Sequence, residues 1–336
     1  MATFDNIRLE KGLYTTGKSF SEALESIDPS ENYAGTSLEG LDAYQRQLKR
    51  FDIKVSGRNS DCIEKFFRTT DSAALFPEYI SRAVWQGFEE NDLVSKLVAT
   101  TTVVDGLDYR SLAADISSQE NNLTAINEGS FIPETKITVK DNLVKLKKHG
   151  RMITASYEAI KYQRLDLFTI ALKQIGASIA RTQFNQAVNT LYLDDGSGGE
   201  SEKLFVSEEN AFGYDTLVSL WMNFDTFKLS TLLVHPSYMT SILTMDEFRD
   251  SAAGLNFHAT GKLITPFGAE IIPLPADCEA IAIGLDKTSA LERVQTGPIM
   301  TEFDKLIDRQ LERASVTMTS GFAKIYNDAV KFLEVM

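Results

Sequence analysis

The side chains best suited to metal binding or nucleophilic catalysis are few and widely spaced in this sequence. They are His149, His235, His258, Cys62 and Cys278. No two of them stand at the short spacing that is typical of a zinc site. We expect His235, just before Pro236, to cap or pack at the end of an apolar strand, and His149–Gly150 to form a turn. The two cysteines are expected to be reduced thiols.

Clusters of glycines and carboxylates could offer a second kind of chemistry. The stretch DDGSGG at residues 194–199 follows a predicted helix and is acidic, whereas a phosphate site needs backbone N–H groups at a helix start. We therefore expect a helix end and a loop there. Acidic clusters at 89–90, 115–120 and 246–250 lack the ligand order of a calcium loop. With no catalytic, cofactor or metal motif recognised, the sequence favours a structural or binding role over an enzyme.

Composition and charge limit the classes of protein to which the chain can belong. With 336 residues, 43% of them hydrophobic, the chain can bury a sizeable core in one large domain or two to three subdomains. The formal net charge of −13 predicts that the chain as a whole repels nucleic acid. The basic stretches at 44–50 and 145–151 are expected to be solvated surface. The N-terminal residues lack a signal-peptide pattern, and no apolar run reaches membrane-spanning length.

The first part of the chain, residues 1–70, has an irregular pattern of predicted structure. Residues 1–70 alternate turn-like pieces with short amphipathic pieces. Apolar Leu41, Leu48 and Phe51 recur near helical spacing, although the stripe is narrow. We expect an extended arm with one helix near 38–50, which needs another surface to lie on.

Strand-forming patterns follow in the next part of the chain. The turn signal Asp105–Gly106 separates two runs rich in β-branched residues. Farther on, Ile137 and Val139 alternate with polar residues, and Val144 and Leu146 repeat the pattern more loosely. Because each run has only a thin apolar face, we expect these two runs to form a hairpin that projects into solvent or onto a neighbouring chain.

Helical periodicity is clearest in two stretches. Residues 75–92 open near Pro77, which a helix N-terminus tolerates. A longer pattern predicts a helix from about 157 to 193, starting at Ser156 or Asp166 and about 50 Å long. Its expected buried stripe is Phe168, Leu172, Ile175, Ile179, Phe184, Val188 and Leu191.

The rest of the chain is expected to form a compact α/β part and a closing pair of strands. Short apolar runs at 231–243, 263–275 and 279–291 alternate with helix-compatible and turn pieces. The tail at 299–335 is expected to form two long strands that flank Ser320–Gly321.

The order of these pieces resembles the major capsid protein of tailed bacteriophages, which has the Hong Kong 97-like fold. NEGSFIPETKITV resembles the lead into the E-loop hairpin of that family, and RMITASYEAIKYQRLDL resembles the strand that begins its spine helix. LLVHPSYMTSIL and GKLITPFGAEIIPLP resemble parts of the A-domain. IAIGLDKTSALERV, followed by DRQLERASVTMTSGFAKIYNDAVKFLEV, resembles the closing strands of the A- and P-domains. The similarity extends from about Leu75 to the C-terminus.

The resemblance implies an α+β fold with an N-terminal arm, an E-loop hairpin, a P-domain with a long spine helix, and an A-domain. It divides the chain as follows: arm, 1–70; first part of the P-domain, 71–111; E-loop, 112–152; spine helix and glycine loop of the P-domain, 153–208; A-domain, 209–296; closing strands of the P-domain, 297–336.

The resemblance also implies a function. Copies of the chain would assemble through pentamers and hexamers into an icosahedral shell around double-stranded DNA, in the bacterial cytoplasm and then in the virion, without a membrane. Further partners would be a portal protein and scaffolding or decoration proteins. The residues expected at contacts between copies are Leu41, Tyr44, Leu48, Phe51, Glu128, Ile132, Pro133, Ile137, Val139 and Lys147.

One departure from the family concerns covalent crosslinks. Some members join subunits through a Lys–Asn bond that a buried Glu promotes. Where the family lysine would precede Pro133–Glu134, this chain has Ile132, and the segment DRQLERASV contains no asparagine. We therefore expect contacts between copies to be noncovalent.

Other functions stay open from the sequence. One is an encapsulin, a nanocompartment shell of the same fold that holds cargo enzymes. Another is an enzyme with a scattered active site, which a pocket with convergent polar groups would favour. A third is a tail or baseplate protein, which would form stacked rings. Under the capsid hypothesis, deleting residues 1–60 is expected to impair assembly more than folding.

Overall fold

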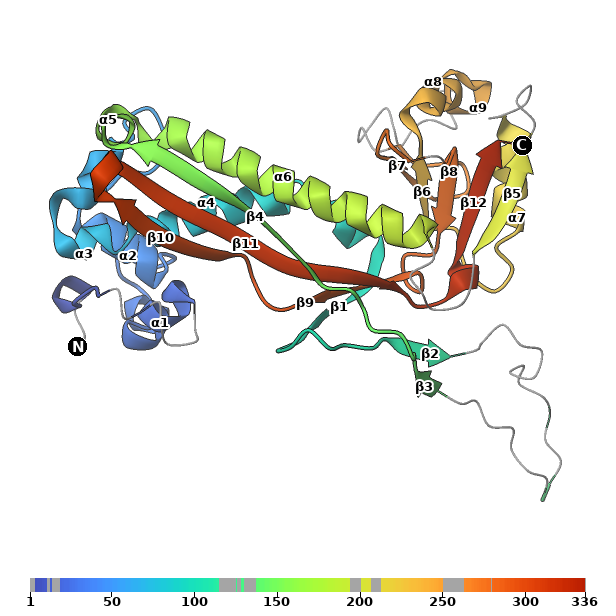
Figure 1. The fold of residues 1–336 in the computed structure, drawn as a ribbon, viewed down its shortest axis with the longest axis horizontal. Coiled ribbons are helices and arrows are strands. Elements are labelled where there is room, and N and C mark those ends of the chain that lie inside the picture. Colours follow the sequence, from blue (N-terminus) through green and yellow to red (C-terminus); the bar gives the residue numbers. More distant parts are fainter. Residues whose placement is uncertain are drawn as a thin grey trace. The chain divides into compact units, whose positions relative to one another are not determined.

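The computed structural model describes residues 4–10, 13, 19–114, 125, 128–129, 137–193, 201–206, 213–249, 263–278 and 280–335. The chain forms two units, each assembled from separate stretches of sequence. Unit 1 consists of Met1–Asp92, His149–Ala180 and Pro298–Met318, and unit 2 consists of Leu93–Lys148, Arg181–Gly297 and Thr319–Met336. Helix α6 (Leu165–Tyr192) and strand β11 (Leu311–Lys324) each contribute residues to both units (Figure 1).

Unit 1 has its core between two helices and a set of strands. Its helices, besides the first part of α6, are α1 (Phe20–Ile27), α2 (Ala43–Arg50), α3 (Thr70–Ala73), α4 (Phe76–Glu90) and α5 (Tyr157–Tyr162), with 3-10 turns at Phe4–Asn6, Ser30–Tyr33, Ile63–Arg68 and Ile307–Arg309. Strands β4 (Lys147–Ser156) and β10 (Met300–Leu306) both pair with β11. Buried side chains of α4, of the first part of α6 and of β11 belong to one apolar cluster, and Ile153 and Ala155 of β4 pack against it.

Helices α4 and α6 meet at two glycines. A Cβ built on Gly176 would lie 2.0 Å from the Val84 carbonyl oxygen, and one built on Gly87 would lie 2.2 Å from the Lys173 carbonyl oxygen. Because real Cβ atoms do not approach backbone atoms so closely, the backbones of the two helices can touch only where both lack side chains. Gly176, the one glycine within the long helical segment, therefore has a packing role.

The N-terminal part is folded, which corrects the expected extended arm. Helices α1 and α2 each begin with a capping box, in which Ser19 and Asp42 accept hydrogen bonds from backbone N–H groups. Both helices bury apolar side chains in the core of unit 1: Phe20, Ala23, Leu24, Ala43, Tyr44 and Leu48. Deleting residues 1–60 would remove this part of the core, so we now expect the deletion to impair folding as well.

A buried ion pair joins α2 to the end of α1. The Nε atom of Arg46 donates to Oδ2 of Asp28 over 2.8 Å, and both side chains are fully buried. The Tyr33 hydroxyl donates to the other oxygen of Asp28 over 2.6 Å, and its ring lies 4.2 Å from the Arg46 guanidinium carbon. The guanidinium also donates to the carbonyl oxygens of Asp28 and Leu41. A buried charge with this many partners is satisfied, but removing one partner would be costly.

The predicted long helix consists of two helices. Ser156 caps α5 as predicted, its side chain accepting from the Ala159 N–H. The helix then stops at Gln163, whose backbone is extended, and Arg164 forms a β-bridge with Cys62. This strand-like contact replaces helical hydrogen bonds, so α6 starts only at Leu165 and is about 42 Å long. The predicted stripe on α6 is otherwise confirmed: its members are buried or pack partly buried against the two cores.

Unit 2 is built around a mixed five-stranded sheet in the order β5-β12-β8-β6-β7. These strands are β5 (Glu202–Val206), β6 (Thr231–Val234), β7 (Glu270–Pro273), β8 (Ala282–Leu285) and β12 (Val330–Val335). One face packs on the end of α6 through Phe184, Val188 and Leu191. A separate cluster joins alternate strand residues to α7 (Tyr214–Met222) and α8 (Pro236–Thr244), which α9 (Asp246–Arg249) follows. Burial on both faces explains the apolar strand sequences.

The remaining strands of unit 2 differ from two expectations. Strand β1 (Val98–Val103) pairs with β9 (Leu291–Gln295), and β9 pairs with β11. Strand β11 runs without a break through Ser320–Gly321, where a turn was expected, because these residues pair with Gln295 and Val294 of β9. A Cβ on Gly321 would lie 2.7 Å from the Lys145 carbonyl oxygen. This glycine marks a close backbone approach. The expected hairpin is also wrong in its pairing, since Ile137–Val139 pairs with Leu112–Ala114 rather than with residues 144–146.

Candidate interaction surfaces

A separate two-stranded ribbon exposes an apolar face in unit 2. Strands β2 (Leu112–Ala114) and β3 (Ile137–Val139) pair antiparallel, with Leu112 opposite Val139. Ile137 lies two residues from Val139 and thus on the same face. Leu112, Val139 and Ile137 are 56%, 57% and 68% exposed. Because a two-stranded ribbon is marginally stable in water, an apolar face left bare indicates contact with another molecule.

A buried carboxylate anchors the base of this ribbon. Glu292 of β9 accepts hydrogen bonds from the hydroxyls of Thr102 (2.5 Å), Tyr109 (2.7 Å) and Ser111. Burial, together with the hydrogen bond to Glu292, raises the pKa of Tyr109. The segment just before β2 is therefore held firmly to the folded sheet, while the ribbon beyond it is left exposed.

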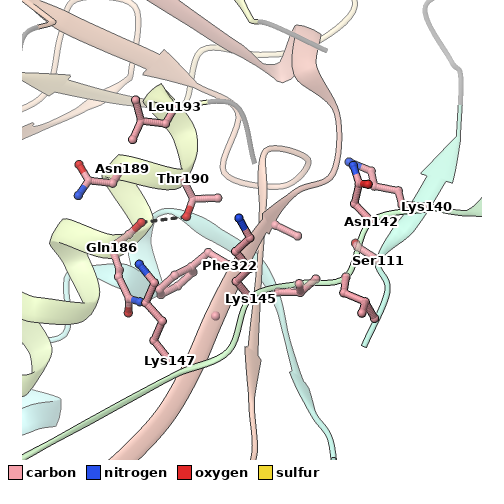
Figure 2. Close-up of a pocket in the computed structure, with 14 residues that line it drawn as sticks. Ser111, Lys140, Asn142, Lys145, Lys147, Gln186, Asn189, Thr190, Leu193 and Phe322 are labelled. Carbon is pink, nitrogen blue, oxygen red and sulfur yellow. Dashed lines mark hydrogen bonds between the residues drawn. The ribbon is translucent and has the colours of Figure 1, made fainter. Parts of the chain in front are cut away.

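Next to the ribbon lies a hollow of about 240 Å³ with a basic lining (Figure 2). Its walls come from the segment 140–147, the end of α6 and strand β11. Lys140, Lys145 and Lys147 line it, and no carboxylate does among the described residues. Figure 2 shows Gln186, Asn189 and Thr190 on α6 and Leu193 just beyond its end. We call this feature the lysine hollow.

Unit 1 exposes a second apolar surface, on α5 and the start of α6. Tyr162, Leu167 and Ile170 are 72%, 55% and 59% exposed. Leu167 and Ile170 are three residues apart and so share one face of α6, away from the buried stripe. The first turns of α6 thus carry apolar side chains on two faces.

Another open hollow, of about 790 Å³, lies in unit 1 and has the opposite charge. Its apolar floor includes Leu9, Phe67 and Phe76, and its carboxylates are Glu10, Asp71, Asp304 and Glu312 against a single Arg8 in its described lining. Arg8 pairs with Glu10 over 3.0 Å. Among the described residues, the linings of this hollow and of the lysine hollow contain no histidine or cysteine.

The ten predicted contact residues fall into three groups. Glu128, Ile137, Val139 and Lys147 are exposed. Leu41 and Phe51 are half-buried, whereas Tyr44 and Leu48 are buried in the core of unit 1, which corrects the expectation that they need a neighbouring chain. Ile132 and Pro133 lie outside the described residues. A contact of the exposed residues with another copy stays a prediction.

The predictions for the individual histidines and cysteines are confirmed in part. His235 caps α8 as expected, its Nδ1 atom accepting from the Ser237 N–H over 3.3 Å. His149 lies within strand β4, so the turn expected there is wrong. Cys62 and Cys278 are not joined in a disulfide. His258 and residues 194–199 lie outside the described residues.

The described part of the chain offers neither a metal-ligand cluster nor a membrane-spanning helix. Within the described residues, no three histidine, cysteine or carboxylate side chains gather as metal ligands would. None of the described helices is both long enough and apolar enough to cross a membrane.

Several surface features were missed by the sequence reasoning. Lys140 was not singled out, and Lys145 was assigned to ordinary solvated surface. A signal for the apolar patch of unit 1 was present, since Leu167 and Ile170 form a second helical stripe beside the buried one. The hydroxyl partners of Glu292 come from segments distant in sequence, and only the fold brings them together.

Comparison with known proteins identifies the family to which this chain belongs. A family model described as phage capsid protein matches residues 140–309, just over half of the chain. The chain belongs to the phage capsid protein family. No curated protein matches it.

Solved structures show the same fold for this capsid protein. The capsid of cyanophage P-SCSP1u aligns with a TM-score of 0.53 at 14% identity, covering 73% of this chain and 88% of that one. The capsid of a native GTA particle gives 0.52 at 12% identity, with coverages of 72% and 90%. A virus-like particle from Pyrococcus furiosus gives 0.50 at 12% identity, with coverages of 76% and 98%. At such identities the likeness shows the fold alone.

The resemblance deduced from the sequence is thereby confirmed. This capsid protein has the Hong Kong 97-like α+β fold, and it is a major capsid protein of the tailed-bacteriophage type. The region that the family model matches contains α6, the lysine segment after β3 and the whole of β10. The surfaces described above are thus parts of a capsid shell protein.

Proposed function

We propose that this capsid protein assembles through pentamers and hexamers into an icosahedral shell that encloses double-stranded DNA. The observation that carries the proposal is the family match over residues 140–309 on a capsid fold. The exposed apolar face of the ribbon supports it, because that face needs a partner. Many modest contacts of this kind sum to a stable shell when the symmetry closes.

The contacts between copies are proposed to be noncovalent. Ile132 stands in place of a crosslinking lysine, and the exposed candidates Ile137 and Val139 offer apolar contact instead. A portal protein and scaffolding or decoration proteins are proposed as further partners, with assembly in the host cytoplasm before release of the virion. The domain limits inferred from the family, such as an E-loop at 112–152 and an A-domain at 209–296, belong to the same proposal.

The charge of the chain bears on how a genome would be enclosed. A net charge of −13 gives the subunit little overall attraction for phosphates, so packaged DNA would be contained rather than bound. We expect the shell to release its DNA freely on opening, even at low salt. DNA that stays on opened shells until the salt concentration is raised would contradict this view.

Expression of the chain alone, followed by negative-stain electron microscopy, tests the proposed assembly. Closed, roughly spherical shells or free pentamers and hexamers are expected. Stacked rings would indicate a tail or baseplate protein, and monomers at every concentration would overturn the proposal.

A second candidate is a shell that encloses protein cargo, as an encapsulin does. The alignment that covers 98% of the virus-like particle chain from Pyrococcus furiosus favours keeping it. The two differ in contents, so particles isolated from their natural source decide between them. Nuclease-protected double-stranded DNA is expected, and particles holding a protein cargo without DNA would favour the second candidate.

A further inference from the structure

We propose that the open hollow of about 790 Å³ in unit 1 binds a segment of another protein that is rich in lysine or arginine and also carries large apolar side chains. We call this feature the acidic hollow. All of its described lining belongs to unit 1. The inference goes beyond the proposed function, because it assigns a ligand to this surface whether or not copies of the chain assemble.

The charges around the acidic hollow are mostly of one sign. Its described lining has four carboxylates and a single cation, Arg8. In the part of the chain that the structure describes, the Asp71 carboxylate is in no hydrogen bond or ion pair. Glu10 pairs with Arg8 over 3.0 Å, and Asp304 pairs over 3.7 Å with Arg313, which lies outside the lining. Because Glu10 and Asp304 are exposed and such ion pairs contribute little, an incoming cation can replace either partner.

These carboxylates suit several separate cations better than one metal ion. They come from residue 10, from α3 and from strands β10 and β11, so they stand around the hollow from different elements. Among the described residues, no three carboxylate, histidine or cysteine side chains gather as metal ligands would. A ligand with positive charges spaced along a chain can meet several of them, whereas a nucleic acid would be repelled.

The floor of the acidic hollow is apolar and adds a second requirement. Leu9 and Phe76 are almost fully buried there, and Phe67 and Pro77 are half-buried. An apolar side chain that enters the hollow is removed from water, which favours binding. Peptide ligands use such a side chain as an anchor, while charged residues at the rim set the choice of partner. A basic segment with apolar side chains meets both requirements.

The basic stretches of this chain do not fit as the ligand. Arg46, in the stretch 44–50, is buried and bonded within unit 1. Lys145 and Lys147 line a hollow of their own, and two hollow surfaces cannot enter each other. Arg151 belongs to strand β4, which is paired with β11. The formal net charge of −13 also makes two copies repel each other. We therefore assign the segment to a different protein.

Fluorescence anisotropy with the labelled peptide GKKLFKKLG tests the proposal on the full-length chain. This peptide is expected to bind, and two matched peptides should bind at least about tenfold more weakly: GEELFEELG, which reverses the charges, and GKKSSKKSG, which keeps the charges and removes the apolar side chains. Asp71→Asn with Asp304→Asn should weaken the binding of GKKLFKKLG at least about fivefold. The matched control, Glu31→Gln with Glu89→Gln, removes the same charge from exposed residues of unit 1 outside the hollow and should bind within about twofold of the wild type.

The outcomes separate this inference from the proposed function. Equal affinity of GKKLFKKLG for the two variants overturns the inference, because the peptide then responds only to net charge. Equal binding of GKKSSKKSG overturns it as well, since the apolar floor then has no part. If the Asp71→Asn and Asp304→Asn variant binds the peptide normally but forms no shells, the hollow is an interface between copies and the inference is wrong. Wild-type protein that binds the peptide but forms no shells contradicts the proposed function alone.

A footprint on the wild-type chain gives a test that does not depend on the folding of a variant. Carboxylates are labelled with a carbodiimide and glycinamide, and the labelled positions are measured by mass spectrometry. Saturating GKKLFKKLG is expected to slow the labelling of Asp71 and Asp304 at least about threefold and to leave Glu31 and Glu89 unchanged. Equal slowing at all four residues, or none, would overturn the inference.

Discussion

Replacing Gly176 by alanine should destabilise unit 1, although the same change in an ordinary helix stabilises it. The added Cβ would lie 2.0 Å from the Val84 carbonyl oxygen and 2.6 Å from the Phe88 nitrogen. Normal contact between such atoms is roughly 3.4 Å or more, so α4 and α6 must separate where their backbones meet. Overpacking of this kind costs ~1–3 kcal/mol and sometimes more, and a clash with backbone on both sides belongs at the upper end.

The helix propensity of alanine offsets part of this cost. Alanine gains about 1 kcal/mol over glycine inside a helix. The net loss expected for Gly176→Ala is therefore about 2 kcal/mol, which corresponds to a fall of ~4–8 °C in the melting temperature for a folding unit of this size. Urea and thermal denaturation followed by circular dichroism measure both quantities under one set of conditions.

A matched control separates the clash from the general effect of the substitution. Gly106 has an ordinary φ, and no atom lies within 4 Å of the position that an added Cβ would take, so Gly106→Ala should be neutral or slightly stabilising. If Gly176→Ala instead gains stability, the close approach of α4 and α6 at this glycine is wrong.

Four further predictions concern other parts of the chain. Asp28→Asn should lower the free energy of unfolding by about 3–5 kcal/mol in urea, because it removes the fully buried carboxylate 2.8 Å from Arg46 and leaves only Glu25, a partly exposed carboxylate 3.8 Å away. Glu25→Gln should cost about 1 kcal/mol or less, and equal losses from the two substitutions would contradict the buried pair. Burial opposes ionisation of Asp61, but hydrogen bonds from the Lys54 N–H and the Lys65 ammonium lower its pKa. The contribution of the Asp61 carboxylate to the free energy of unfolding is therefore present above the unfolded-state pKa of about 3.9 and is lost as the pH falls through the lower folded-state pKa. The difference in the free energy of unfolding between wild type and Asp61→Asn should shrink below this pH range, and a difference that grows there would refute the assignment. Tyr109→Phe removes one of three hydroxyl donors to Glu292 and should lower the free energy of local opening by about 1 kcal/mol. Faster hydrogen exchange of residues 109–112 would show this loss, whereas unchanged exchange would mean that this anchor does not hold the ribbon. Ile179→Asp should unfold unit 1 because it buries an unpaired charge, while Gln174→Asp on the exposed side of the same helix should fold; a soluble, shell-forming Ile179→Asp protein would show that the stripe is not core.

The parts of the fold that were predicted correctly are those that local patterns specify. Pro77 and the helical spacing of Ile80, Val84 and Phe88 predicted helix α4, and Ser156 predicted the start of α5. The stripe through Leu172, Ile179 and Val188 identified the buried side of α6 correctly. Such signals depend on neighbours within a few residues, which the sequence displays directly.

The errors occur where distant segments override local pattern. Nothing near Gln163 predicts a helix break, because the cause is the strand-like contact with residues 61–63. Strand β11 continues through Gly321 because this residue pairs with Val294 of β9, and the glycine leaves room for the backbone at Lys145. The N-terminal part looked irregular because turn-like pieces alternate there with short amphipathic ones. The pairing of Asp28 with Arg46, 18 residues apart, helps to fold it and was not visible in the local pattern.

The candidate contact surface was only partly predictable. The alternation around Ile137 and Val139 identified an exposed strand correctly but not its partner, since β2 is a three-residue strand with a weak pattern. The lysine hollow could not be predicted, because its walls come from four separate stretches of chain.

The division of each unit among separate stretches has a consequence for biosynthesis. Residues 298–318 complete unit 1 and residues 319–336 complete unit 2, and their side chains Val316, Met318 and Phe332 are buried in the two cores. A ribosome must therefore translate past residue 318 before the core of unit 1 can close, and past residue 332 before the core of unit 2 can close. Prematurely terminated chains lack the closing strands of both cores, so proteases can degrade them before they enter a growing particle.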